Sequence, residues 1–253
     1  MSELILVGAG PGDPELITLK AINALKKADV VLYDALANDE FLNYCRPDCI
    51  KVYVGKKPGI HSYQQIFIND MIVDYARQYQ RVVRLKGGDS FVFGRGHEEL
   101  ECARAHGIEV TIVPGISSSI SVPALNEIPL TKRGVNESFW VVTGTTVDHE
   151  MSNDINLAAQ SSATVVILMG MKRLNKIVEV FRMFRGENEA IGIIQNGSRK
   201  DQKEVFGKLE DIESNVEKEN IGSPAIIVIG EVVKCARKEF YEQLATEVAF
   251  KKI

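Results

Sequence analysis

The sequence predicts an α/β protein built from two α/β domains. Short apolar segments rich in β-branched residues recur along the 253 residues, as buried strands do. Segments with apolar residues at helical spacing separate them. Several strand-like segments end in glycine, which is typical of α/β units that turn at a ligand-binding edge. We place the domains at 1–115 and 116–253, because the small, hydroxyl-rich turn at residues 114–119 lies between two such series.

The composition argues against several classes of function. The formal net charge is −4, so the chain lacks the basic excess of a general nucleic-acid binder. The four cysteines and four histidines show no spacing typical of a metal site, and we expect reduced thiols and no metal. The chain shows no basic leader and no apolar run of membrane-spanning length, so we expect a cytoplasmic protein.

The first α/β unit begins with a strand at residues 4–7 and a glycine-rich turn at residues 8–12. We expect a helix after this turn, with Asp13 as its N-cap and Pro14 at its first helical position. A dinucleotide-binding loop would need a third glycine at the position of Asp13, and Pro11 lacks a backbone donor for phosphate. We therefore do not expect a nicotinamide cofactor.

Two further strands end at candidate ligand groups. Residues 30–33 precede Asp34, which would lie at the carboxyl edge of a parallel sheet, where α/β proteins bind ligands. The alternative role for Asp34 is a helix cap. Residues 51–54 lead to Lys56, which is either a solvated loop lysine or a neighbour of Asp34. A capping box at residues 62–65 predicts the start of the next helix.

The central motif of the chain joins a strand, two glycines and the start of a helix. The missing side chains of Gly87 and Gly88 would let a ligand lie against the backbone. Asp89 follows them with a carboxylate that can accept hydrogen bonds. Arg95 and Glu98 stand three residues apart where we expect a helix to begin, so both can face one cleft. Taken alone, the motif also fits a purely structural role, in which a glycine turn leads to a helix whose first residues are charged.

The remaining elements continue the same alternation. Residues 99–106 predict a helix and residues 110–113 a strand, and the turn after that strand is either a domain hinge or a ligand loop. A second series follows, with a charged exposed loop at 200–204 and a solvated helix at 208–219. The strands expected in this series lie at residues 140–144, 164–170, 191–194 and 224–233.

With these residues in place, the chain resembles the tetrapyrrole methylase family. The matching motifs occur in family order between residue 4 and about residue 230. They include residues 7–13, 28–34, 84–89, 91–96, 113–116 and 128–131. The positions that depart from the family pattern are Ala35, Ser90, His97, Lys132 and Thr145, and these departures leave the donor motifs intact.

The resemblance implies two α/β domains in a homodimer, with S-adenosyl-L-methionine in a cleft between the domains. It implies transfer of two methyl groups to C-2 and C-7 of uroporphyrinogen III, which gives precorrin-2 through precorrin-1 on the route to sirohaem and cobalamin. The donor-binding residues it implies are Pro11, Gly87, Gly88, Asp89, Val92, Ser117, Ser118, Met169, Gly197 and Ala225. For catalysis it implies Asp34 as proton acceptor and Lys56 as proton donor, with Arg95 and Glu98 also involved. The carboxylates of this acceptor add Arg133, besides Arg95, Lys56 and Lys132, as a candidate substrate clamp.

The chemistry of the acceptor agrees with this set. Uroporphyrinogen III bears eight carboxylates, so fixed arginines suit its binding because each can make bidentate contacts. Two alternatives remain. One is another member of the family, such as a later precorrin methyltransferase. The other, from a different class, is a non-catalytic nucleotide-binding module, which would not need Asp34, Lys56, Arg95 and Glu98.

Overall fold

The computed structural model describes residues 2–55, 65–148 and 150–236. The chain divides into two compact units, Met1–Ser117 and Ser118–Ile253, which we call unit 1 and unit 2. Each unit has its own sheet and its own hydrophobic core. In the described part of the chain, no helix is long and apolar enough to cross a membrane.

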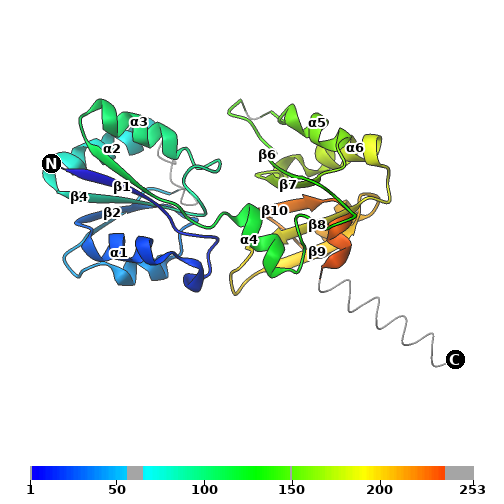
Figure 1. The fold of residues 1–253 in the computed structure, drawn as a ribbon, viewed down its shortest axis with the longest axis horizontal. Helices are drawn as coiled ribbons and strands as arrows, with labels where there is room; N and C mark the ends of the chain where they lie inside the picture. Colours follow the sequence, from blue (N-terminus) through cyan, green and yellow to red (C-terminus); the bar gives the residue numbers. More distant parts are fainter. Residues whose placement is uncertain (1, 56–64, 149, 237–253) are drawn as a thin grey trace, which may run out of the picture. The chain divides into compact units, whose positions relative to one another are not determined.

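The sheet of unit 1 has five strands in the order β3-β2-β4-β1-β5 (Figure 1). All four pairings are parallel, as expected. The strands are β1 (Glu3–Gly8), β2 (Val30–Tyr33), β3 (Ile50–Tyr53), β4 (Arg81–Lys86) and β5 (Glu109–Val113). Because the sheet is parallel, the loops that follow β1, β2, β4 and β5 all leave from one edge.

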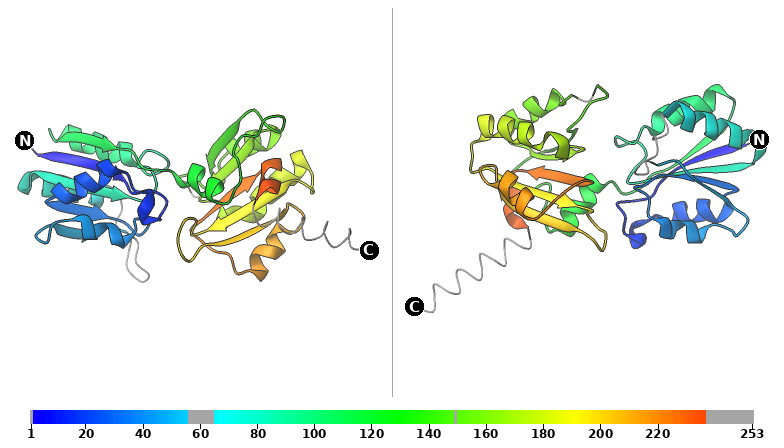
Figure 2. Two further views of the ribbon diagram at one scale, coloured as in Figure 1. Left: turned by 60° about the horizontal axis from the view of Figure 1, so that its bottom comes forward. Right: turned by 180° about the vertical axis from the view of Figure 1, so that it is seen from behind.

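Helices cover both faces of this sheet (Figures 1 and 2). On one face α1 (Leu19–Lys27) and the 3-10 helix η2 (Asp39–Tyr44) pack against alternate strand residues such as Val7 and Leu85. On the other face α2 (Gln65–Gln78) and α3 (Gly96–Ala105) pack against the intervening residues, which include Leu6 and Val82. The period-2 alternation of buried strand residues thus explains why both faces are apolar.

The first predicted helix differs from the observed structure. Asp13 does cap a helix, since its side chain accepts a hydrogen bond from Glu15 N at 2.9 Å, but this is only the 3-10 helix η1 (Pro14–Leu16). The chain then becomes extended at Ile17. A second cap, Thr18, accepts from Ala21 N at 3.1 Å and starts α1. The segment therefore contains two caps, and each begins its own helix.

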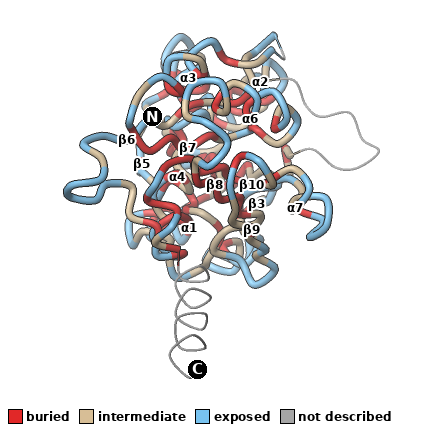
Figure 3. The backbone as a smooth tube through the Cα atoms, turned by 90° about the vertical axis from the view of Figure 1, so that its right-hand side faces the viewer, coloured by how far each residue is buried: buried red, intermediate tan, exposed pale blue. Residues whose placement is uncertain are grey.

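The sheet of unit 2 also has five strands, in the order β6-β7-β10-β8-β9, but it is mixed. Only β6 and β7 are parallel, and β10 runs antiparallel between β7 and β8. Its central strands are buried (Figure 3). The strands are β6 (Phe139–Thr143), β7 (Thr164–Leu168), β8 (Ala190–Gln195), β9 (Lys203–Lys208) and β10 (Ala225–Ile229).

The helices of unit 2 lie on both faces of its sheet. One face packs against α5 (Asp154–Gln160), α6 (Leu174–Arg185) and α7 (Ile212–Lys218). The other packs against α4 (Ser118–Leu125) and the 3-10 helix η4 (Glu231–Cys235). The short 3-10 helix η3 (Met171–Arg173) leads into α6.

Three predictions for unit 2 were wrong. The strand expected at 224–233 ends at Ile229, and the residues from Glu231 onwards form the 3-10 helix η4. The exposed loop expected at 200–204 gives way to β9, which begins at Lys203 and pairs antiparallel with β8. The solvated helix expected at 208–219 is shorter, because Lys208 belongs to β9 and α7 begins at Ile212. β9 is an edge strand with exposed lysines at both ends, so its sequence carries little of the apolar signal that identifies a buried strand.

Candidate functional site

Five glycines gather at the carboxyl edge of the sheet in unit 1. Gly8 ends β1 and Gly10 follows it, Gly87 and Gly88 follow β4, and Gly115 follows β5; we call this group the glycine cradle. Gly10 N donates to Gly88 O at 3.1 Å, and Gly88 N donates to Gly10 O at 2.7 Å. A Cβ on Gly8 would lie 2.6 Å from the Cα of Gly115. The three loops are thus in backbone contact, which only residues without side chains permit.

Gly87 and Gly88 differ in the space around them. A Cβ on Gly88 would meet no atom within 4 Å, and the residue has a φ of +67°. The Cβ position of Gly88 therefore faces open space, and a ligand contact there stays a prediction. A Cβ on Gly87 would lie 2.5 Å from the Cβ of Leu36, so there the absent side chain serves packing against the turn after Asp34.

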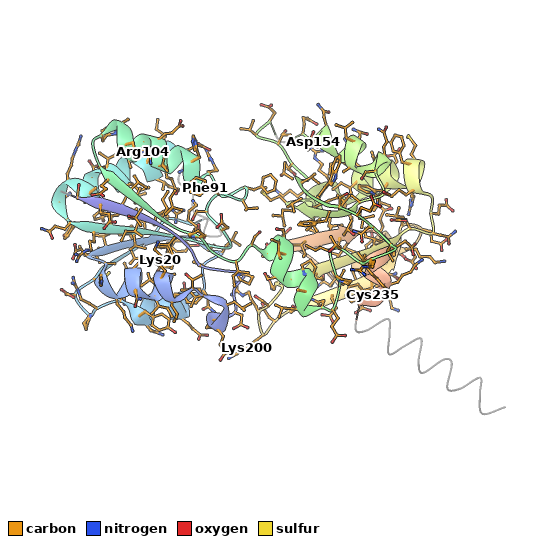
Figure 4. The ribbon with its side chains drawn as sticks, in the orientation of Figure 1. Lys20, Phe91, Arg104, Asp154, Lys200 and Cys235 are labelled. Atoms are coloured by element: carbon orange, nitrogen blue, oxygen red, sulfur yellow. The ribbon has the colours of Figure 1, made fainter. Side chains whose placement is uncertain are left out.

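Asp89 fastens two of the cradle loops together. Its Oδ1 accepts from Phe91 N at 2.8 Å, and its Oδ2 accepts from Gly115 N at 3.0 Å. Each carboxylate oxygen has a second lone pair, so Asp89 can accept further hydrogen bonds from a ligand. Phe91 lies in the loop that joins β4 to α3 (Figure 4).

Arg95 and Glu98 form a bidentate ion pair at the start of α3. Arg95 Nε donates to Glu98 Oε1 and Arg95 Nη2 donates to Glu98 Oε2, both at 2.7 Å, and both side chains are about half exposed. The hydrogen bond raises the pKa of Arg95 and lowers the pKa of Glu98. Arg95 has a φ of 60°, a strained conformation for a residue with a side chain and one that is enriched at functional sites.

The glycines on either side of Arg95 are needed for a tight loop. A Cβ on Gly94 would lie 2.7 Å from the carbonyl oxygen of Ser90, and one on Gly96 would lie 2.5 Å from it. Gly96 N also donates to Ser90 O at 2.9 Å. The loop therefore folds back on Ser90 and presents Arg95 on its outer side, where the side chain is exposed.

Asp34 belongs to a buried group of charges that the sequence prediction missed. Its Oδ2 accepts from Arg84 Nη2 at 3.2 Å, and Arg84 Nε donates to Glu99 Oε1 at 3.1 Å. Lys86 Nζ donates to the same Glu99 oxygen at 2.9 Å. Burial lowers the pKa of Lys86, the charge of Arg84 lowers it further, and Glu99 opposes the shift. We call Asp34, Arg84, Lys86 and Glu99 the buried charge cluster.

A signal for this cluster was present in the sequence. Arg84 and Lys86 are two residues apart in a strand, so they point to the same face of the sheet. Two cations on a buried face require nearby anions, because unpaired buried charges are too costly. Asp34 and Glu99, the latter at a buried position of α3, supply them.

Three further predicted donor residues lie in unit 1. Pro11 stands in the turn after β1, half-buried, between Gly10 and Gly12. Val92 is exposed in the loop after β4. Ser117 is buried in the segment after β5 and ends unit 1.

The other predicted donor residues lie in unit 2, as does Arg133. Ser118 begins α4, Ala225 begins β10, and Arg133 is exposed in the turn before β6. Met169 is half exposed, with a φ of 56°. A Cβ on Gly197 would lie 2.6 Å from Cγ2 of Val122 in α4, so this glycine is needed for packing. Lys56 lies outside the described residues.

Three residues that depart from the family pattern make contacts of their own. Lys132 Nζ lies 3.3 Å from Cys235 Sγ, at the end of η4 (Figure 4). Thr145 Oγ1 donates to Met169 O at 3.0 Å, and His97 Nδ1 lies 3.5 Å from Glu101 Oε2. None of the three takes part in the glycine cradle or the buried charge cluster.

The four cysteines are free thiols. Within the described ranges, no three His, Cys, Asp or Glu side chains gather where they could hold a metal ion. The absence of a metal from the reaction stays a prediction.

Comparison with known proteins identifies the family. A uroporphyrinogen-III C-methyltransferase of Methanocaldococcus jannaschii is 46% identical over 233 residues, which cover 91% of this chain and 96% of the relative. One of Bacillus subtilis is 41% identical and covers 96% of this chain and 95% of the relative. A crystal structure of the Thermus thermophilus uroporphyrin-III C-methyl transferase with S-adenyl homocysteine matches with a TM-score of 0.79 and 38% identity, over 92% of this chain and 99% of that one.

The family model of the Tetrapyrrole (Corrin/Porphyrin) Methylases matches residues 3–213. This range contains the glycine cradle, the ion pair of Arg95 and Glu98, and the buried charge cluster. The chain belongs to the tetrapyrrole methylase family.

Proposed function

We propose that this chain is an S-adenosyl-L-methionine-dependent uroporphyrinogen-III C-methyltransferase. It would methylate C-2 and C-7 of uroporphyrinogen III and release precorrin-2, with precorrin-1 as the intermediate. The observation that carries the proposal is the placement of an open glycine cradle and the charged residues Asp34, Arg95 and Glu98 after the ends of adjacent strands. Relatives named for this activity match almost the whole chain.

The residues present in unit 1 fit the methyl donor. The backbone at Gly88 faces open space, which allows the donor to approach closely. Asp89 keeps free lone pairs that can accept from a ribose hydroxyl or from the donor's amine. Pro11, Gly87, Val92 and Ser117 are the other donor residues that we propose here. When bound, the donor supplies a methyl group already activated by a sulfonium.

The donor residues that we propose in unit 2 rest on the family resemblance. They are Ser118, Met169, Gly197 and Ala225. The soft thioether of Met169 suits contact with an adenine ring. Its half-exposed position makes the side chain available for such a contact.

Because the methyl group arrives activated, the protein mainly aligns the acceptor carbon and takes up a proton afterwards. We propose Asp34 as the proton acceptor and Lys56 as the proton donor. The ion pair with Arg95 lowers the pKa of Glu98, which makes this carboxylate a poorer base than an unpaired glutamate. Arg95 and Arg133 would bind acceptor carboxylates. Until the acceptor binds, Glu98 would hold the guanidinium of Arg95, and an acceptor carboxylate would then take the place of the Glu98 carboxylate.

The direct test is a methyl-transfer assay. We expect the purified chain, incubated with uroporphyrinogen III and S-adenosyl-L-methionine, to give a product heavier by two methyl groups. Omitting the methyl donor should leave the mass unchanged. A chain that binds S-adenosyl-L-homocysteine but never methylates uroporphyrinogen III would contradict the proposal and favour another family member.

The assembly and the location of the protein complete the proposal. We propose a homodimer, on the family resemblance and on the apolar content of residues 139–233. Sedimentation at micromolar concentration should show a dimer, and a monomer alone would contradict it. We also propose that the chain works in the cytoplasm, which fractionation of cells would test.

A further inference from the structure

We propose that Arg84 and Glu99 are positioning residues, which fix the carboxylate of Asp34 for proton uptake. The inference rests on the proposed function, because it assigns Asp34 the role of proton acceptor. Neither residue reaches the surface, since Arg84 is 2% exposed and Glu99 is fully buried. Arg84 therefore acts through Asp34, Glu99 acts through Arg84, and neither touches the acceptor.

The first support is the geometry of Arg84. Its Nη2 donates to Asp34 Oδ2, while its Nη1 donates to the carbonyl oxygens of Leu32 at 3.3 Å and Leu85 at 3.0 Å. With Nε on Glu99, all three nitrogens of the guanidinium have acceptors. A planar fork with every nitrogen bound has one orientation, so Arg84 is a rigid support for Asp34.

The second support is the state of Asp34 itself. Its Oδ1 accepts from Leu36 N at 3.1 Å, so each of the two carboxylate oxygens has a donor. The side chain is nevertheless 23% exposed. Asp34 is thus held from behind by Arg84 and from the side by the turn at Leu36, and its remaining surface is open to a ligand.

The third support is the position of Glu99. Its Oε1 accepts from Arg84, from Lys86 and from Gln65 Nε2 at 3.2 Å, while its Oε2 has no hydrogen-bond partner among the residues described. An unsatisfied buried oxygen destabilises a fold. The carboxylate is therefore placed where it anchors Arg84 and Lys86, at some cost to its own hydrogen bonding.

Stability alone is a poor explanation for the cluster. Buried ion pairs can often be replaced by well-packed apolar residues without loss of stability, because removing charges from water is costly. The cluster is next to the glycine cradle in the chain, since Lys86 directly precedes Gly87, and the backbone of Lys86 accepts a hydrogen bond from Ala9 N at 2.7 Å, between Gly8 and Gly10. We therefore explain the cluster by the orientation that Arg84 gives to the Asp34 carboxylate, which the reaction needs.

Unit 2 provides a matched control. Arg185 and Glu189 form another largely buried pair, with Nη1 to Oε1 at 3.2 Å, and the side chains are 9% and 14% exposed. Arg185 also donates to backbone carbonyls, those of Ala158, Ala159 and Ala163. It resembles Arg84 in burial and in bonding, but it contacts no proposed site residue.

The test compares Arg84→Lys, Glu99→Gln and Arg185→Lys in the methyl-transfer assay. Arg84→Lys keeps the charge and loses the fork, so we expect kcat to fall on the order of a hundredfold, as a small misplacement of a reacting group does. We expect KM to change by less than roughly threefold, and the affinity for S-adenosyl-L-homocysteine to change by less than roughly twofold. Changes this small would mean that neither the acceptor nor the donor binds differently. Glu99→Gln should also lower kcat, as Arg84→Lys does, and Arg185→Lys should leave kcat unchanged.

A double-variant cycle separates positioning from a general structural role. If Arg84 acts through Asp34, adding Arg84→Lys to Asp34→Asn should cause little further loss of kcat. Losses that multiply, or an Arg84→Lys variant that keeps the kcat of the parent, would overturn the inference. So would unfolding of both Arg84→Lys and Glu99→Gln, as judged by circular dichroism. A parent chain without turnover would instead overturn the proposed function.

Discussion

Gly10 and Gly88 exchange two backbone hydrogen bonds, although they lie far apart in the sequence. This single antiparallel bridge lies beyond the ends of two parallel strands and joins the loops after β1 and β4. Gly115, from the loop after β5, packs against both Gly8 and Gly88. A change in one loop therefore displaces the other two.

We predict that Gly115→Ala destabilises unit 1. A Cβ there would lie 2.6 Å from the carbonyl carbon of Gly8 and still closer to the carbonyl oxygen of Gly88, and backbone atoms cannot move aside as a side chain can. Overpacking of this kind typically costs about 1–3 kcal/mol. Urea unfolding measures the change. Gly222→Ala is the control, because its Cβ would meet only Gln195 Nε2, at 3.8 Å.

We predict that Gly88→Val abolishes donor binding while the chain stays folded. The new side chain would fill the open space above the cradle. A left-handed φ adds about 1–2 kcal/mol of strain for a residue with a side chain. Gly107→Val is the matched control, since Gly107 has a φ of +71° and no atom within 4 Å of its Cβ position, but lies in the turn after α3.

Calorimetry with S-adenosyl-L-homocysteine distinguishes the two variants. Both should lose similar stability, and only Gly88→Val should lose affinity. Unchanged affinity in a folded Gly88→Val protein would show that the donor does not approach this backbone.

We predict that Arg95→Ala loses methyl transfer and keeps donor binding. Removing a charge-assisted contact in a binding site typically costs roughly 2–5 kcal/mol, which is on the order of a thirtyfold loss or more. Arg95→Lys should recover little, because an ammonium cannot reproduce the planar fork. Arg77→Ala is the control, since Arg77 forms an exposed ion pair of the same spacing with Asp74. Turnover near the parent rate in Arg95→Ala would favour Arg133 and Lys56 as the substrate clamp.

The buried carboxyl of Glu189 predicts a pH dependence of stability. Burial raises its pKa from 4.5, and the nearby Arg185 only partly opposes the shift. The native state therefore holds this proton at pH values where the unfolded state has lost it. As pH rises from 4.5 through the raised pKa, the group should lower the free energy of unfolding, and the loss is complete above that pKa.

Unfolding at a series of pH values, for the parent and for Glu189→Gln, isolates this contribution. The difference in free energy of unfolding, parent minus variant, should decrease as pH rises through the window. A difference that increases over the same range would mean that attraction to Arg185 outweighs burial.

The sequence predicts the loops of unit 1 better than its buried charges. Glycines, proline and caps act locally, so the turn after β1, the cap at Asp13 and the glycines after β4 could be recognised from neighbouring residues. The partners of Arg84 are Asp34 and Glu99, which lie 50 and 15 residues away. Pairing over such separations depends on which strand ends lie side by side. The order of strands in the sheet could not be read from the pattern of this one sequence.

The failure to predict β9 has the same kind of cause, because this strand also depends on a distant partner. Val205 is its only buried residue, between Lys203 and Lys208 at exposed ends. Its extended conformation depends on pairing with β8, a tertiary interaction that outweighs weak local preference. Gly87 is a different case. The sequence indicated that a glycine matters at this position, but its contact with Leu36 could be recognised only in the folded structure.

The order of strands in unit 1 has a consequence for how the chain folds as it is made. β1 is translated before the strands that flank it, because its partners are β4 and β5. Until Arg81–Lys86 and Glu109–Val113 have left the ribosome, the apolar residues of β1 have no sheet to join. We therefore expect unit 1 to fold late in its own translation, and the nascent chain to depend on chaperones during that interval.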